Sequence, residues 1–459
     1  MTGWSLEHFA RVADGRLRGS DISFTGVATD TRKLVPGQLF VALSGPHFDG
    51  HDFAGEALEQ GAAGVVVAAG RCGGLEPRVE VADPLAALGS FAADWRARHQ
   101  LDVLAVTGSN GKTTVRAMLG RILEAYSPGK VVTTRGNFNN AIGLPLCLLE
   151  IRPEHRYGVF ELGANHHGEI DALARLARPE VGVITNAAAA HLEGFGSLDG
   201  VARAKGELLE NLAEDGTAVL NADDPRVAIW RDLAGHRRRI EFGMESGEVR
   251  PVGHPELGES TTRAELQTPV GSVEIELALP GRHNLMNALA AAAAAAAVDV
   301  SPEAIRRGLE AMQPEPGRLQ PMAARNGARL IHDSYNANPA SLEAGLEWLS
   351  GQSGERWLVL GDMAELGVEG PRAHARAGEQ ARASGVTRLF TLGSLAAEAA
   401  ETFGSGAEHC QRLERLQELL RTGLGPEVTV LVKGSRRMGL DRLVEALCEV
   451  PPSHAEGEH

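Results

Sequence analysis

Cysteine is scarce in this chain of 459 residues, and no two cysteines lie close together. The four are Cys72, Cys147, Cys410 and Cys448. This spacing excludes the paired-cysteine motifs of zinc sites and of thiol redox sites. Isolated reduced thiols are typical of proteins that work in the cytoplasm, and we expect a cytoplasmic location.

Long apolar segments are also missing. The N-terminus has no basic segment followed by an apolar core, and no apolar run is long enough to cross a membrane. The nearest candidate is the alanine run at 290–297. Because alanine favours helices but is only weakly apolar, this run predicts a helix buried against a neighbour.

Positive charge is in the minority. The formal net charge is −15, which argues against a broad binding surface for nucleic acid or for anionic membranes. Any site for a phosphorylated ligand must therefore be a local group of basic residues.

What the chain does have is a repeated alternation of strand and helix patterns. Its length suggests about two to four domains. Residues 1–99 mix short elements, residues 100–314 predict a mostly parallel sheet covered on both sides, and residues from 315 onward predict a doubly wound domain after a Pro-Gly linker. The predicted strands of the last two segments lie at 131–133, 157–162, 181–185, 218–220, 330–331, 357–360, 388–392 and 428–432.

The most informative stretch is a glycine-rich turn between a predicted strand at 101–106 and an amphipathic helix. It consists of Thr107, Gly108, Ser109, Asn110, Gly111, Lys112, Thr113 and Thr114. In that context backbone N–H groups can face phosphate oxygens, the lysine can neutralise them, and the next hydroxyl can ligate Mg2+. A standard P-loop has a further glycine where this chain has Val106, so an ordinary glycine-rich turn with a surface lysine is the alternative.

Polar residues stand at the carboxyl ends of the predicted central strands, where parallel sheets collect their chemistry. Glu161 closes one strand, His191 follows another, and Lys205 lies on a helical stretch. Beside a phosphate loop, the carboxylate and the imidazole are candidate metal ligands. Taken singly, each is equally well explained as a capping or interior residue.

Several other positions keep two interpretations. Asn284, just before the alanine-rich helix, is either an N-cap or a reader of a nucleotide base. Arg32 can pair with a phosphate or with nearby Asp30. The basic strand end at 433–437 is either a solvated helix start or an anion site. Arg318, just past the linker, can close over phosphates if the domains hinge.

Together these motifs resemble the ATP-dependent Mur ligases of bacterial cell-wall synthesis. The matching stretches lie in all three segments, at 29–32, 48–53, 108–114, 136–143, 161–170, 185–196, 205–207, 281–284, 333–339, 361–367 and 432–436. Glu-Leu-Gly-Ala-Asn-His at 161–166 and Asp-Ser-Tyr-Asn-Ala-Asn-Pro at 333–339 are similar to the family members that add a dipeptide rather than a single amino acid.

The resemblance implies an α/β fold of three domains. These are a small UDP-binding domain at 1–99, a central P-loop ATPase-like domain with a mostly parallel sheet at 100–314, and a C-terminal Rossmann-like domain at 315–459. It also implies a monomeric ligase that joins D-alanyl-D-alanine to UDP-N-acetylmuramoyl-tripeptide through an acyl phosphate. ATP and two Mg2+ ions would be required, with no nucleic acid and no membrane insertion.

Catalytic roles are carried over from the same resemblance. The implied catalytic residues are Lys112, His191, Lys205 and Arg318. Thr113 and Glu161 would hold the magnesium ion of ATP, and His191 would help to hold a second. Lys205 would be carbamylated and would ligate metal as a carboxylate. An unmodified Lys205 that pairs with phosphate is the alternative.

Binding roles are implied in the same way. The phosphate loop at 108–114 would hold ATP, with Asn284 at the adenine and Asp333 at the ribose. The implied substrate contacts are Thr31 and Arg32 for uridine diphosphate, Asn140 near the phosphates, and Tyr335 and Asn336. His332 stands where relatives often have a second acid, which leaves its local contacts open.

Two other classes of protein are kept as alternatives. A ligase similar to folylpolyglutamate synthase would share the middle and last domains, but the motifs at 29–53 count against it. A non-catalytic nucleotide-binding protein would be expected to have lost Lys112, Glu161, His191 or Lys205, and all four are present.

Overall fold

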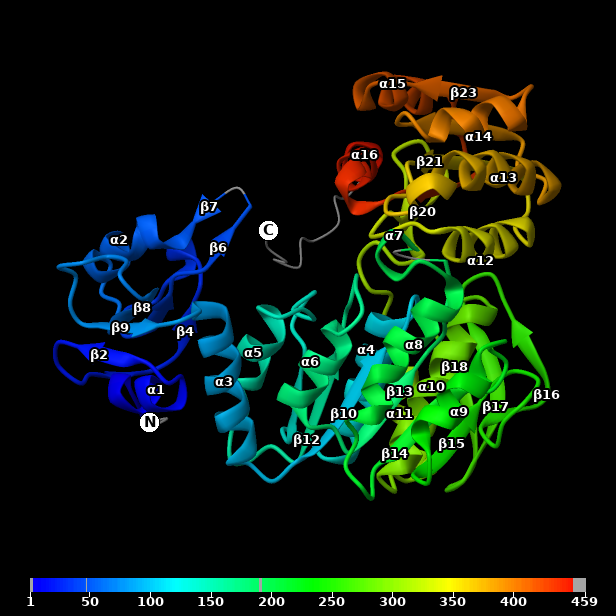
Figure 1. Cartoon of the computed structure of the whole chain (residues 1–459). Helices are drawn as coiled ribbons and strands as arrows, with labels where there is room; N and C mark the ends of the chain where they lie inside the picture. Colours follow the sequence, from blue (N-terminus) through cyan, green and yellow to red (C-terminus); the bar gives the residue numbers. More distant parts are fainter. Residues whose placement is uncertain (1–2, 47, 190–191, 449–459) are drawn as a thin grey trace.

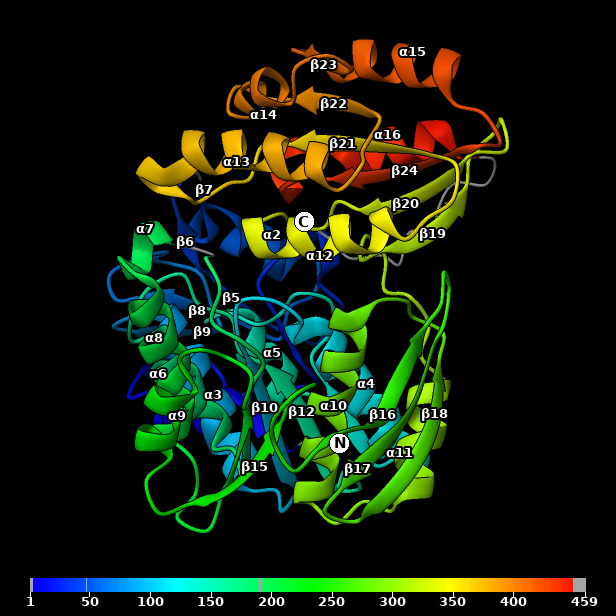
Figure 2. The same cartoon turned by 90° about the vertical axis from the view of Figure 1, so that its right-hand side faces the viewer.

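The computed structural model describes residues 3–46, 48–189 and 192–448. Figure 1 shows three α/β bodies in chain order, the N-terminal one in blue, the central one from cyan to green, and the C-terminal one from yellow to red. In Figure 2 the C-terminal body lies above the central one. Within the described ranges, every helix is too short or too polar to span a bilayer.

The N-terminal body is built on a five-stranded sheet in the order β2-β9-β8-β5-β4, parallel except for the β2–β9 pair. The sheet consists of β2 (Arg16–Arg18), β4 (Val27–Ala28), β5 (Leu39–Val41), β8 (Gly64–Ala68) and β9 (Arg78–Val81). Around it lie β1 (Trp4–Ser5), α1 (Leu6–Val12), β3 (Ser23–Phe24), η1 (Thr31–Lys33), β6 (Ser44–Gly45), β7 (Phe48–Asp49), η2 (Gly50–Phe53) and α2 (Ala54–Glu59).

Helix α3 (Pro84–Ala97) joins this body to the central one. It packs against α5 (Gly143–Leu148) and α6 (Glu169–Ala177), and the two bodies share one apolar core. The buried Arg96 of α3 donates hydrogen bonds to the carbonyl oxygen of Ala177 and to the Glu180 carboxylate. The connection is therefore a packed helix, and it restricts rotation of the N-terminal body.

The central body contains a six-stranded, all-parallel sheet in the order β11-β12-β10-β13-β14-β15. Its strands are β10 (Asp102–Thr107), β11 (Val131–Thr133), β12 (Tyr157–Glu161), β13 (Val181–Ile184), β14 (Thr217–Asn221) and β15 (Arg238–Phe242). A three-stranded antiparallel sheet follows, with β16 (Arg250–Leu257), β17 (Thr262–Thr268) and β18 (Gly271–Leu277).

Helices cover both faces of this parallel sheet. On the face toward α3 lie α5, α6, α8 (Leu198–Glu210) and α9 (Val227–Ala234), with the short α7 (Leu192–Phe195) beside them. The opposite face carries α4 (Lys112–Tyr126) and α10 (Arg282–Ala297), and α11 (Pro302–Glu310) packs against α4 and β18. The alanine run lies in α10, and Ala290 to Ala296 are buried there. Because these side chains are small, α10 can lie close against the neighbouring helix α4.

The C-terminal body is a second doubly wound unit. Its sheet has the order β19-β20-β24-β21-β22-β23, and only the edge pair β19–β20 is antiparallel. Its strands are β19 (Gln320–Ala323), β20 (Arg329–Asp333), β21 (Glu355–Gly361), β22 (Arg388–Leu392), β23 (Ala407–Cys410) and β24 (Val428–Lys433). Its helices are α12 (Pro339–Ser350), η3 (Gly367–Glu369), α13 (Gly370–Ala383), α14 (Ala396–Phe403), α15 (Leu413–Gly423), η4 (Arg436–Met438) and α16 (Leu440–Leu447). The α/β class predicted from the alternating pattern is confirmed.

Candidate nucleotide-binding site

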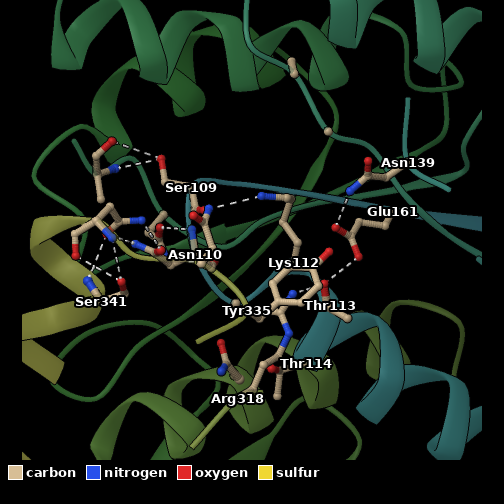
Figure 3. A pocket seen from close by; sticks show the side chains of 18 of the residues that line it. Ser109, Asn110, Lys112, Thr113, Thr114, Asn139, Glu161, Arg318, Tyr335 and Ser341 are labelled. Carbon is tan, nitrogen blue, oxygen red and sulfur yellow. Dashed lines mark hydrogen bonds between the residues drawn. The ribbon is translucent and has the colours of Figure 1, made fainter. Parts of the chain in front are cut away.

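A cavity of about 880 Å³ lies where the central and C-terminal bodies meet. Its central wall includes the phosphate loop, the segment at 139–142 and the carboxyl end of β12, and its C-terminal wall includes the linker and the end of β20. Carboxyl ends of parallel strands are where open α/β sheets bind ligands. Figure 3 shows some of the side chains that line it.

The phosphate loop connects β10 to α4, and two of its glycines have positive φ angles. The φ of Gly108 is 144° and that of Gly111 is 83°. A β-carbon on Gly108 would lie 2.0 Å from Thr185 Oγ1, and one on Gly111 would lie 2.3 Å from Asn287 Oδ1. Both positions therefore need glycine because of backbone conformation and close packing. This packing holds the loop at the cavity wall, and its phosphate-binding role stays a prediction.

Lys112 lies at the first position of α4, and its side chain folds back over the loop. Nζ donates hydrogen bonds to the carbonyl oxygens of Gly108 at 2.8 Å and Ser109 at 3.3 Å. Desolvation lowers the pKa of Lys112, nearby Glu161 opposes this shift, and Arg318 adds to it. The ammonium is thus held at the mouth of the loop, where the anion of a nucleotide would favour its charged form.

Thr113 and Glu161 form the candidate metal site. The hydroxyl of Thr113 donates to Glu161 Oε2 at 2.9 Å, and Asn139 Nδ2 donates to Oε1 at 2.7 Å. Glu161 is buried at the end of β12. A carboxylate and a hydroxyl beside a phosphate loop are hard oxygen donors, and this donor set suits Mg2+. His191, the other predicted ligand, lies outside the described residues.

Lys205 is buried on α8. Its Nζ donates to the Ala164 carbonyl oxygen at 3.4 Å and lies 5.0 Å from the centre of the Phe195 ring. Burial lowers the pKa of Lys205 to about 7, and the charge of Lys112 contributes in the same direction. Among the described residues it has no carboxylate partner within salt-bridge distance. An amine in this state has a substantial neutral fraction at neutral pH.

Arg318 approaches the phosphate loop from the linker side. Its guanidinium donates to Thr113 Oγ1 at 2.8 Å and lies 4.2 Å from the centre of the Tyr335 ring. Arg436 lies over the same ring, at 5.6 Å. The predicted position of Arg318 near the phosphate loop is thus present in this structure without further movement.

Asp333 and Lys433 form a largely buried ion pair in the C-terminal wall of the cavity. Lys433 Nζ donates to Asp333 Oδ2 at 2.6 Å, and the backbone N–H of Leu319 donates to Oδ1 at 3.2 Å. His283 faces this pair from the central side, and desolvation lowers its pKa to about 4. The cavity therefore presents a neutral imidazole opposite a paired carboxylate.

Asn284 is not the N-cap of α10. The helix begins at Arg282 with Gly281 as its N-cap. Asn284 lies in the first turn, is buried, and donates from Nδ2 to the Pro280 carbonyl oxygen at 2.8 Å. The capping interpretation is wrong because the chain turns into the helix three residues earlier. Asn284 lines the cavity, and its contact with a base stays a prediction.

The predicted contacts for the other substrates are spread over two bodies. Asn140, Tyr335 and Asn336 line the cavity. Thr31 and Arg32 lie on η1 of the N-terminal body and do not line it. In this structure Arg32 pairs with Asp30 through two nitrogens, at 2.9 and 2.7 Å. A phosphate would have to compete with that carboxylate.

Three polar groups of the cavity wall did not stand out in the sequence. Asn139, Lys433 and Asn338 appear there only as members of longer motifs. Their roles depend on partners distant in the chain, namely Glu161, Asp333 and Asn110. The sequence signal that exists is that Lys433 ends a strand and that Asn139 and Asn338 lie in the segments that follow strands.

Comparisons with known proteins agree over the whole chain. The family models described as "Mur ligase family, catalytic domain", "Mur ligase middle domain" and "Mur ligase, glutamate ligase domain" match residues 23–96, 106–295 and 317–436. UDP-N-acetylmuramoyl-tripeptide--D-alanyl-D-alanine ligase of Escherichia coli (strain K12) is 42% identical over 451 residues, which cover 98% of this chain and 99% of the relative.

Solved structures give the same grouping. The crystal structure of MurF from Acinetobacter baumannii has a TM-score of 0.89 and 34% identity, and the match covers 96% of this chain and 97% of that one. MurF ligase from Thermotoga maritima in complex with ADP has a TM-score of 0.81 and 26% identity, with 92% and 96% covered.

Proposed function

The chain belongs to the Mur ligase family, and we propose that it is the ATP-dependent ligase that joins D-alanyl-D-alanine to UDP-N-acetylmuramoyl-tripeptide. The product would be the UDP-linked pentapeptide used in peptidoglycan synthesis. The similarity to a relative of that name extends over nearly all of both chains. The structural observation that carries the proposal is the placement of Lys112, Thr113 and Glu161 opposite Arg318 in one cavity.

The reaction must bring one anion to another. The carboxylate at the end of the tripeptide attacks the γ-phosphorus of ATP, which gives an acyl phosphate and ADP. The amine of the dipeptide then attacks the acyl carbon, and phosphate leaves as the amide forms. Positive groups fixed before the reaction lower the electrostatic barrier of the first step. The cations Lys112 and Arg318, which line the cavity, would do so.

The donor set at Thr113 and Glu161 supports Mg2+ as a cofactor. The ion would supply further positive charge for the phosphate groups. We propose two ions, with His191 and a carbamylated Lys205 as ligands of the second. Carbamylation joins the neutral amine to CO2 and releases one proton, so a neutral group becomes an anion. The burial of Lys205 and its lack of a carboxylate partner in the described part of the chain support this role.

Further contacts follow from the position of the cavity. Asn284 would contact adenine and Asp333 the ribose, since both face the same space beside the phosphate loop. Asn140, Tyr335 and Asn336 would contact the peptide substrates there, and Thr31 and Arg32 would hold the uridine diphosphate end. We also propose that the protein is a monomer that acts without nucleic acid. We propose a cytoplasmic location because ATP and nucleotide-linked precursors are cytoplasmic metabolites. Light scattering after gel filtration would test the monomer.

The proposed reaction is tested by its acceptor. Phosphate release from ATP is measured with UDP-N-acetylmuramoyl-tripeptide and, in separate reactions, D-alanyl-D-alanine, D-alanine, D-glutamate, or a folate with glutamate. We expect release, and a mass gain of one dipeptide, only with D-alanyl-D-alanine. Release with another acceptor would assign the chain to a sister ligase. No release with any acceptor would favour a nucleotide-binding protein.

A further inference from the structure

The side chain of Asn110 links the phosphate loop to the C-terminal body. Asn338 Nδ2 donates to Asn110 Oδ1 at 2.7 Å, and Asn110 Nδ2 lies 3.4 Å from Asn338 Oδ1. The two residues are 228 positions apart in the sequence. Their amides therefore form a reciprocal pair across the boundary between two domains, directly at the phosphate loop.

The backbone of Asn110 is already held by the central body. Its N–H donates to Asn186 Oδ1 at 3.0 Å, and its carbonyl oxygen accepts from Thr185 Oγ1 at 2.6 Å and from Asn186 Nδ2 at 3.1 Å. The two residues that follow β13 thus hold both backbone groups of Asn110. Only the side chain of Asn110 remains available to contact the C-terminal body.

Asn338 is equally fixed on its own side. It is the buried N-cap of α12, where Oδ1 accepts from the N–H of Ser341 at 2.9 Å and its own N–H donates to Ser341 Oγ at 3.1 Å. Because Oδ1 accepts from the helix, Nδ2 must face away from it, toward Asn110. Figure 3 shows Asn110 and Ser341 at the same side of the pocket.

A second contact crosses the boundary three residues further along the chain, where Arg318 donates to Thr113 Oγ1. The loop is therefore held from the C-terminal side at Asn110 and from the linker at Thr113. Two separate contacts fix the orientation of the C-terminal body relative to the phosphate loop, whereas a single contact would allow rotation about it. The Asp333–Lys433 pair lies in the same wall and is placed by the same docking.

We propose that Asn338 is a positioning residue for nucleotide binding, which docks the C-terminal body onto the phosphate loop through the side chain of Asn110. This role rests on the proposed function only in that the loop binds ATP. Binding and docking are reciprocal, since a nucleotide that orders the loop also stabilises the amide pair. Asn338 acts through Asn110 and need not touch the nucleotide.

The variant Asn338→Ser tests this role. Serine retains an N-cap oxygen for Ser341 but lacks Nδ2 and does not reach Asn110. We expect the Kd for ADP, measured by calorimetry without peptide substrates, to rise roughly three- to tenfold, the effect of one neutral hydrogen bond. In ligation assays the KM for ATP should rise while the KM for D-alanyl-D-alanine stays unchanged. Thermal stability should remain that of the wild type.

A double-mutant cycle with Asn110→Ala tests whether the side chains of Asn110 and Asn338 act as a pair. If the two side chains act as a unit, the Kd for ADP of the double variant equals that of the weaker single variant. Ser301→Ala is the matched control, because it removes the N-cap contact to the Ala304 N–H on α11, away from the cavity. It should lower thermal stability and leave the Kd for ADP unchanged.

Two results would overturn the proposal. One is an Asn338→Ser variant with the wild-type Kd for ADP. The other is a double variant in which the fold-increase in this Kd equals the product of the two single increases. Neither depends on the peptide substrates. Absence of ligation by a wild-type protein that binds ADP would reject the proposed function and leave the docking role standing.

Discussion

At the scale of single residues, burial of Lys112 disfavours its charge in the folded state, whereas that charge is what the side chain offers to ATP. Replacement by methionine removes the charge that the phosphate loop offers to ATP, and we expect phosphate release to fall roughly 100- to 1,000-fold. Thermal stability should not fall, because the lowered pKa of Lys112 shows that its charged form is disfavoured in the folded state. The exposed Lys130 provides the control, and Lys130→Met should retain full activity. Full activity of Lys112→Met would contradict the phosphate-loop assignment.

Lys205 gives a chemical test of the proposed carbamate. Lys205→Ala should lose ligase activity and recover part of it when short carboxylates such as formate or acetate are added, because a free carboxylate can occupy the space of the missing carbamate. Phosphate release at increasing carboxylate concentration is the measurement. The same carboxylate concentrations are added to the wild type, which shows any general effect of the salt on phosphate release. Full activity of Lys205→Ala without carboxylate would exclude the carbamate role.

His283 makes stability depend on pH. Its folded-state pKa of about 4 lies below the ordinary value of 6.5, so between these values the unfolded chain binds more protons than the folded one. The free energy of unfolding should therefore rise from pH 4 to pH 6.5, by at most about 3 kcal/mol from this residue. Unfolding of wild type and His283→Asn at both pH values measures the difference. An equal pH dependence in the two proteins would contradict the shift.

At the scale of helices and strands, the contact of α11 with α4 allows a test of packing. A β-carbon on Gly308 would lie 2.3 Å from the Ile122 α-carbon, so Gly308→Ala must push two backbones apart. We expect a loss of about 1–3 kcal/mol in the free energy of unfolding, measured by calorimetry.

The matched control is Gly55→Ala on α2, where no atom lies within 4 Å of the added carbon. There alanine should stabilise the chain by about 0.5 kcal/mol, because glycine is the poorer helix former. A Gly308→Ala variant as stable as Gly55→Ala would show that α11 can move away from α4 without cost.

At the scale of the whole molecule, the β16–β17 turn reaches the C-terminal body. Glu259 pairs with Arg329 at 2.7 Å, and its carbonyl oxygen accepts from Trp348 Nε1 at 3.3 Å. Exposed ion pairs contribute little to unfolding, typically about 0–1 kcal/mol. We therefore expect Glu259→Ala to leave the unfolding temperature nearly unchanged and to broaden the distribution of distances between the two bodies, measured by small-angle X-ray scattering without nucleotide.

The control for this contact is Glu276→Ala, which breaks the exposed Arg263–Glu276 pair within the same sheet. It should change neither stability nor the distribution of distances. The difference between Glu259→Ala and the wild type in this distribution should become smaller at high salt, because salt also screens the Glu259–Arg329 pair of the wild type. Identical scattering of Glu259→Ala and wild type would show that the other boundary contacts suffice.

The alternating pattern was enough to predict the parallel strands that form the centres of the sheets. The runs at 157–162, 181–185, 428–432 and their neighbours correspond to β12, β13 and β24 within a residue or two. Such strands are buried on both faces, so their sequences are apolar throughout. The edge strands β15 and β23 escaped prediction because polar residues such as Arg238 and Glu408 interrupt their apolar runs.

The sequence by itself determined the phosphate loop, the polar ends of the central strands and the family. Each of these is written in neighbouring residues, since strand, turn and helix follow from local spacing. Tertiary structure alone decided that Asn338 meets Asn110, that Arg318 meets Thr113, and that Lys433 pairs with Asp333. These contacts join residues 100 to 228 positions apart. They depend on how whole domains pack, and the spacing of neighbouring residues carries no signal for that packing.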